Sequence, residues 1–216
     1  GATIRGIVFD GASEVADAIR IDDTVTGAPV VISGCTVRNY TNRFVYVSLS
    51  GKIESLTIDD CIFIGADNST TNKAIYASSA HTQVETLSVT NSTFLNFNTG
   101  SNYFFRINCG EELVLMPVVL IDHCTFYNCY DRRGVYLYNA GRSTIKNCIS
   151  AFSERRDDTK SFTAYGDESI VKNVISYNVD LYGSAPKENI ISKNPLFVDA
   201  ENGNFQLYKD SPAVGA

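Results

Sequence analysis

The chain has 216 residues and a formal net charge of −6 at pH 7, and 44% of its residues are hydrophobic. This length and hydrophobic content suit one large domain with a core, while the negative charge argues against a general nucleic-acid-binding protein. The longest apolar run, residues 113–121, contains Pro117 and is too short to span a membrane.

A six-residue motif recurs along the chain: an apolar residue, a spacer, a turn residue, a small apolar residue, a spacer and often an aromatic residue. Its copies begin at Ile4, Ile32, Ile58, Val89, Ile121 and Ile145, with a weaker copy at Val171 and a degenerate one at Ile191. The fourth positions (7, 35, 61, 92, 124, 148, 174 and 194) are therefore 20 to 32 residues apart. A fixed motif in repeats of variable length is typical of a solenoid with a constant core and variable loops.

The third position of the motif predicts a sharp corner between two short strands. It is occupied by Gly6, Gly34, Asp60, Asn91, His123, Asn147, Asn173 and Lys193. Gly, Asn, Asp and His tolerate the left-handed backbone that such a corner needs.

The fourth position predicts a small buried slot. It holds Cys35, Cys61, Cys124 and Cys148, and the other clear or weak copies carry Ile7, Ser92 and Val174. We therefore expect free thiols in the core, with a disulfide or a reactive thiol as the alternative. Cysteine usage does not determine the compartment.

A third strand with strict alternation lies between successive motifs. Its inward pairs are Ile19/Ile21, Val45/Val47, Ile75/Ala77, Phe105/Ile107, Val135/Leu137 and Phe162/Ala164. Three short strands per coil, stacked as parallel sheets, predict an all-β, right-handed parallel β-helix of about seven to eight coils. We expect one domain, with coils over 1–180 and the last coil and a C-terminal cap over 181–216. Because no similar cap is visible at the N-terminus, we expect a fragment of a longer protein.

The same alternation predicts two columns of outward side chains. The central column is Arg20, Tyr46, Tyr76, Arg106, Tyr136 and Thr163, and Tyr138 and Tyr165 end the neighbouring column. Tyrosine rings offer flat apolar faces to sugars, and arginine can clamp a carboxylate. Stacked aromatic packing without a ligand is the alternative.

Two loops that lead into this strand carry charge clusters. One contains Arg132 and Arg133, and the other contains Asp157, Asp158 and Lys160. With Arg106, the residues Arg132, Arg133 and Lys160 are candidate catalytic groups, because a basic side chain can remove a proton in β-elimination. Asp157 and Asp158 are candidate ligands of a Ca²⁺ ion that neutralises a sugar carboxylate. Solvated loops with internal ion pairs are the alternative.

Histidine chemistry is not expected. His123 occupies a predicted corner and His81 follows the third strand of its coil, so the two form neither a zinc site nor a Ser–His pair.

The repeat resembles the right-handed parallel β-helix of the pectate-lyase-like superfamily over the whole chain. The C-terminal stretch from Asn194-Pro195-Leu196-Phe197-Val198-Asp199 to Asp210-Ser211-Pro212-Ala213-Val214-Gly215 is similar to the ending of β-helix domains in secreted or surface glycan-utilisation proteins of gut Gram-negative bacteria, many of them called polysaccharide-lyase-like. The resemblance implies an extracytoplasmic protein that meets polysaccharides. In that superfamily the outward strand face and its loops commonly form the substrate groove.

We therefore expect an extracytoplasmic polysaccharide-interacting domain, and as its catalytic form a polysaccharide lyase acting on acidic, uronate-containing glycans. A glycosidase is a less favoured enzyme. The alternatives are a non-catalytic carbohydrate-binding domain and a structural or adhesin-type surface domain. The expected partner is an acidic polysaccharide bound by a monomer, without nucleic acid or a membrane span, and Ca²⁺ is the one cofactor considered.

Overall fold

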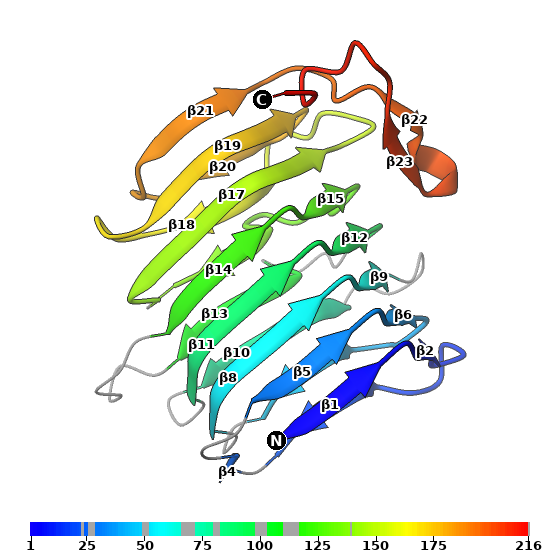
Figure 1. The fold of residues 1–216 in the computed structure, drawn as a ribbon, viewed down its shortest axis with the longest axis vertical. Coiled ribbons are helices and arrows are strands. Elements are labelled where there is room, and N and C mark those ends of the chain that lie inside the picture. The colour runs from blue at the N-terminus through cyan, green and yellow to red at the C-terminus, as the bar shows by residue number, and fades with distance from the viewer. Residues whose placement is uncertain are drawn as a thin grey trace.

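The computed structural model describes residues 1–22, 24–25, 29–48, 52–65, 72–79, 83–97, 103–109, 117–138 and 140–215, with only the backbone at 24, 25, 78, 79 and 109. Its fold is a parallel β-solenoid, in which the coils stack from the N-terminus at one end to the C-terminus at the other (Figure 1). The predicted fold class is confirmed.

Each coil contributes strands to two sheets. The first strands are β1 (Ala2–Arg5), β5 (Val30–Ser33), β8 (Lys52–Asp59), β11 (Gln83–Thr90), β14 (Val118–Asp122), β17 (Arg142–Ala151), β19 (Ile170–Tyr177) and β21 (Lys187–Ile191). The second strands are β2 (Val8–Asp10), β6 (Thr36–Arg38), β9 (Ile62–Ile64), β12 (Thr93–Leu95) and β15 (Thr125–Tyr127). Together with the short β4 (Thr24–Val25) they form a 14-stranded sheet.

The third strands form a separate 7-stranded sheet. They are β3 (Asp17–Ile21), β7 (Arg43–Val47), β10 (Lys73–Ser79), β13 (Phe105–Cys109), β16 (Val135–Leu137), β18 (Lys160–Ala164) and β20 (Asp180–Tyr182). Five coils have three separate strands each, whereas the sequence predicts seven to eight such coils. In the next two coils, β17 and β19 continue through the corner as single strands because their pairing persists from Cys148–Val174 into Ile149–Ile175.

The corners follow the predicted motif. Its third-position residues have φ between 51° and 64° at Gly6, Gly34, Asp60, Asn91, His123, Asn147 and Asn173. The eighth corner is Asn189, with φ 48°, so the prediction of Lys193 was wrong. Strand β21 pairs with β19 through Val171–Lys187 and Val174–Ile190. A lysine therefore stands where the other copies begin with an apolar residue, and this hides the copy in the sequence.

Stacked side chains fill the core. Phe94 lies between Phe63 and Phe126, with ring centroids 5.0 and 4.8 Å away and nearly parallel planes. The fourth-position cysteines are buried and unpaired, as expected, and each thiol donates to the carbonyl two residues earlier. Such thiols pack as small apolar side chains with a weak donor.

A hairpin of β22 (Phe197–Asp199) and β23 (Asn204–Leu207), joined through the 3₁₀ turn η1 (Ala200–Asn202), lies beside the last coils (Figure 1). Phe197 and Phe205 pack edge-on against Tyr127 of β15. The Tyr127 hydroxyl donates to Glu201 Oε1 at 2.6 Å. The C-terminal segment is thus anchored to the outer side of the second strands.

The described part of the chain contains no helix with the length and apolar character needed to cross a membrane.

Candidate functional site

The outward side of the 7-stranded sheet carries the central column predicted from the repeat spacing. Strand register pairs Arg20 with Tyr46, Tyr46 with Tyr76, Tyr76 with Arg106, Arg106 with Tyr136 and Tyr136 with Thr163. The register extends to Tyr182 through Thr163, a member that the sequence reasoning missed because the last coil is short. Thr163 is fully buried and its hydroxyl donates to the Arg133 carbonyl.

A second column of side chains lies on the same surface. In most coils its member precedes the central-column residue by three positions in the sequence. Its members are Asp17, Arg43, Lys73, Tyr103, Arg133, Lys160 and Asp180. Direct pairing joins Asp17 to Arg43, Arg43 to Lys73, and Lys160 to Asp180. We call the surface formed by these two columns the Tyr–Arg face.

The second column covers part of the first. Arg43 lies over the ring of Tyr46, with its guanidinium carbon 3.5 Å from the ring centroid. Arg133 covers Tyr136 in the same way at 4.7 Å. Tyr46 and Tyr136 are consequently only 6% exposed, although they point outward. The rings at these two coils hold cations by cation–π attraction, and their contact with sugar stays a prediction.

Tyr103 connects neighbouring coils across the face. Its ring stacks on Tyr76 and on Tyr136, with centroids 6.1 and 5.9 Å away. Its hydroxyl accepts a hydrogen bond from Arg106 Nη1. Burial, with a contribution from Tyr76, raises the pKa of Tyr103. The hydroxyl therefore stays protonated and fixes the Arg106 guanidinium.

Arg106 and Arg133 form the centre of the face. The Arg106 guanidinium carbon lies 4.4 Å from the Tyr103 centroid and 5.8 Å from the Tyr136 centroid. Its Nε is buried without a hydrogen-bond partner. Among the described residues, no carboxylate oxygen lies within 4.0 Å of either guanidinium. Two positive charges are thus held in place with unused donors.

Lys73 is a functional candidate that the sequence did not single out. Burial lowers the pKa of its ammonium; Asp131 opposes the shift, and Arg43 and Arg106 reinforce it. An amine with a lowered pKa beside two guanidinium groups is a candidate general base. Beside it, Asn72 is buried with neither Oδ1 nor Nδ2 hydrogen-bonded.

Exposed aromatic rings lie toward the C-terminal end of the face. Tyr138 is 40% exposed and stacks on Tyr136 at 5.7 Å, and Tyr165 meets Tyr138 edge-on at 5.8 Å. Tyr182 is 57% exposed. Of the rings proposed for sugar contact, Tyr138, Tyr165 and the partly exposed Tyr76 remain accessible.

Carboxylates neutralise the cations at both ends of the face. Arg43 forms a bidentate pair with Asp17 at 2.8 Å for both bonds, and Arg20 Nε donates to Asp22 at 2.6 Å. At the other end Lys160 and Arg155 both contact Asp180. Partial burial acts to raise the pKa of Asp180, but the hydrogen bonds from Arg155 and Lys160 outweigh it and lower that pKa.

The remaining predicted residues lie away from the centre. Arg132 is exposed, and its backbone N–H donates to Asp131 Oδ1. Asp157 is paired with Arg155 and Asp158 is exposed. In the described ranges no three His, Cys, Asp or Glu residues are grouped to hold a metal ion. The Ca²⁺ role of Asp157 and Asp158 stays a prediction. His81 and the entering loops at 66–71 and 98–102 lie outside the described residues.

The comparisons with known proteins add a partial family match. A family model described as "Domain of unknown function (DUF4957)" matches residues 1–98. The matched segment runs from β1 through β12 and includes the first half of the Tyr–Arg face. No curated protein matches the chain.

Proposed function

We propose that this domain binds acidic, uronate-containing polysaccharides along the Tyr–Arg face. The observation that carries the proposal is the Arg106–Arg133 pair, whose guanidinium groups are fixed over Tyr136 without a carboxylate partner in the described structure. Positive charges held in place with unused donors suit a planar carboxylate, which guanidinium groups bind by paired hydrogen bonds.

The neighbouring rings suit the rest of such a ligand. A sugar whose carboxylate contacts Arg106 and Arg133 can place its apolar face on exposed Tyr138 or Tyr165. Since successive coils are about 4.8 Å apart, a chain molecule running along the stack meets similar groups repeatedly. As part of the same proposal we place the domain outside the cytoplasm, because its resemblance is to secreted and surface proteins. We also propose that it acts as a monomer.

Calorimetric titration of the purified chain with oligogalacturonate, alginate and hyaluronan fragments tests the proposal. We expect at least one of them to bind, more weakly at high salt, and neutral cellohexaose to bind the Tyr–Arg face far less. Arg133→Gln, at an exposed position, should weaken binding by about tenfold or more, since a hydrogen bond to a charged group contributes about 1.5–3 kcal/mol. Arg142→Gln is the matched control, because Arg142 is an exposed arginine on β17 of the other sheet.

Absence of binding across the acidic panel would overturn the proposal. Equal affinity of Arg133→Gln, Arg106→Gln and the unmodified chain would also overturn it, provided that thermal unfolding shows all three to be folded. A structural or adhesin-type role would then be favoured.

Cleavage of the bound glycan by a lyase reaction is a second candidate function, and the lowered pKa of Lys73 favours it. In β-elimination, a base removes the proton beside the carboxylate, the bond to the glycosidic oxygen breaks, and an unsaturated uronate forms. The departing oxygen takes up a proton from solvent and leaves as a hydroxyl group. Arg106 and Arg133 would stabilise the negative charge that develops on the carboxylate. Ultraviolet absorbance of the products measures the reaction; Lys73→Met should abolish it while binding persists. No absorbance with any binding substrate excludes the lyase but not the binding function.

A further inference from the structure

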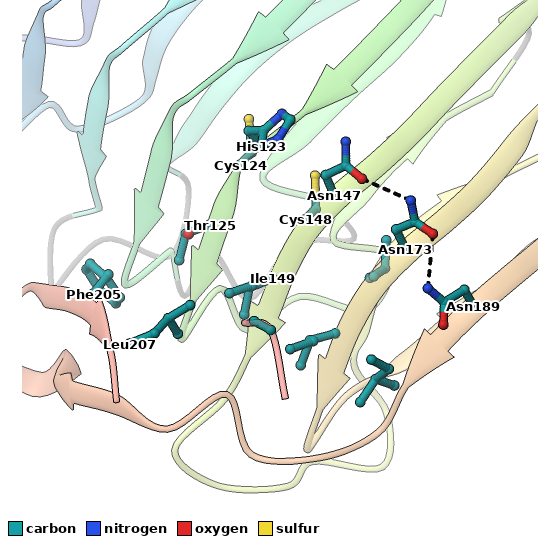
Figure 2. Close-up of a pocket in the computed structure, with 14 residues that line it drawn as sticks. His123, Cys124, Thr125, Asn147, Cys148, Ile149, Asn173, Asn189, Phe205 and Leu207 are labelled. Carbon is teal, nitrogen blue, oxygen red and sulfur yellow. Dashed lines mark hydrogen bonds between the residues drawn. The ribbon is translucent and has the colours of Figure 1, made fainter. Parts of the chain in front are cut away.

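A groove of about 420 Å³ lies between the corners of the last coils and the C-terminal hairpin (Figure 2). It belongs to the 14-stranded sheet and its hairpin, and shares no residue with the Tyr–Arg face. One of its walls carries the corner asparagines Asn147, Asn173 and Asn189, and Phe205 and Leu207 of β23 stand across from them. Its volume falls within the usual range of small-molecule sites.

The asparagine wall is a chain of amides with donors to spare. Asn189 Nδ2 donates to Asn173 Oδ1 at 3.1 Å, and Asn173 Nδ2 donates to Asn147 Oδ1 at 3.1 Å. Asn147 Nδ2 donates in turn to Asp122 Oδ1 at 2.9 Å. Each amide nitrogen carries two N–H groups, and this chain uses one of them. Successive coils therefore present a row of unused N–H donors, and Asn173 and Asn189 are exposed.

The opposite wall is apolar and held in position. Phe205 and Leu207 are half-buried, and Ile149 and Ile191 extend the apolar lining. The edge-on packing of Phe205 against Tyr127, with centroids 5.6 Å apart, ties the hairpin to the coils. No Asp, Glu, Lys or Arg lines the groove in the described part of the chain.

We propose that this groove is a second ligand site, which takes an uncharged, hydroxyl-rich ring such as a neutral sugar. The ring's hydroxyl oxygens accept hydrogen bonds from the amide row, and its C–H face packs on Phe205 and Leu207. A uronate is disfavoured, because its carboxylate would lose water, and His123, the one lining residue that can become a cation, is already paired with Asp122 at 2.7 Å. The groove and the Tyr–Arg face thus select opposite ligand charges.

Nuclear magnetic resonance of the full chain provides a local test through the side-chain amide signals of the asparagines. We expect cellobiose or maltose to shift the Asn173 and Asn189 signals saturably, and digalacturonate to leave them unchanged. Asn189→Gly removes the last amide and keeps a residue that accepts positive φ. It should weaken binding by about tenfold, the equivalent of about 1.4 kcal/mol.

Asn178→Gly is the matched control, because Asn178 also has positive φ, at 59°, but lies outside the groove. Its affinity for the neutral sugars should equal that of the unmodified chain. The proposal is overturned if neither sugar shifts the amide signals at millimolar concentration, or if Asn189→Gly binds as tightly as the control. Equal shifts with digalacturonate would overturn the selection for uncharged ligands.

Discussion

The ring of Tyr103 stacks on the ring of Tyr136, with centroids 5.9 Å apart and planes 14° apart. Tyr103 enters from the second column of the Tyr–Arg face and Tyr136 belongs to the central column, one coil further on. Their stacking brings the Arg106 guanidinium over both rings. This arrangement makes the stability and the proposed binding of the face depend on the same few side chains.

The hydrogen bond between Arg106 and the Tyr103 hydroxyl should contribute to stability. Tyr103→Phe removes the acceptor and keeps the stacked ring, so we expect the free energy of unfolding to fall by about 1–2 kcal/mol. Arg106→Met should remove the same interaction. A double-mutant cycle measured by urea denaturation should therefore show coupling of at least about 0.5 kcal/mol. Simple additivity of the two losses would contradict the contact.

Two glycines with similar φ should respond very differently to alanine. Gly34 has φ 60° and open surroundings, where an added Cβ comes no closer than 3.8 Å to another atom. We expect Gly34→Ala to cost about 1–2 kcal/mol from backbone strain alone. At Gly134, with φ 58°, an added Cβ would overlap the carbonyl oxygens of Lys160 and Ser161.

The overlap adds to the strain, so Gly134→Ala should cost about 2–5 kcal/mol. Thermal unfolding of the two variants side by side measures the difference. Equal losses would show that β16 and β18 are not as close as described.

The described core thiols should be unreactive in the folded protein. Cys35, Cys61, Cys124, Cys129 and Cys148 are buried and unpaired. Burial raises the pKa of Cys61 to about 11 and raises the pKa of Cys129 and Cys148 as well. In a Cys109→Ser variant, a thiol reagent at pH 8 should label almost nothing until denaturant is added, when five groups react. Rapid labelling without denaturant would contradict the packed core.

Acid should weaken the hydrogen bonds along the row of corner asparagines, because that row ends on Asp122. Partial burial acts to raise the pKa of this carboxyl, but the Asn147 amide and Lys146 outweigh it and lower that pKa below 3.8. A lowered folded-state pKa means that the stabilisation is present above the unfolded value and is lost as pH falls through the folded value. Asp122→Asn should therefore be less stable than the unmodified chain at neutral pH.

The stability difference between Asp122→Asn and the unmodified chain should shrink as pH falls below 3.8. Urea denaturation across about pH 2–7 measures this difference, because that range of about 5 pH units spans the titration of an aspartate. Asp167→Asn, at an exposed position, is the control and should show no such convergence. A difference that is constant with pH would mean that Asp122 is not stabilised by its charge.

Several features of the fold and the site could be predicted because they depend only on alternation and on the repeat. The central column follows from side chains alternating along each third strand, and the corners follow from residues that accept positive φ. The copy at Asn189 could not be found in this way, since Lys187 breaks the apolar pattern. Arg133 and Lys160 were predicted only as loop residues, and the column that they belong to was missed, because its members stand three residues earlier, a spacing that alternation alone would assign to the core.

The sequence by itself determined the parallel solenoid, its corners and the line of tyrosines and arginines on one side. Local backbone preference and a repeated register are enough to specify these features. Only the tertiary structure decided that Arg43 and Arg133 cover Tyr46 and Tyr136, that Lys73 has a lowered pKa, and that the hairpin faces the asparagine row. Each of these depends on distances between atoms of different coils, which are set by the path of the loops and by packing rather than by any one strand.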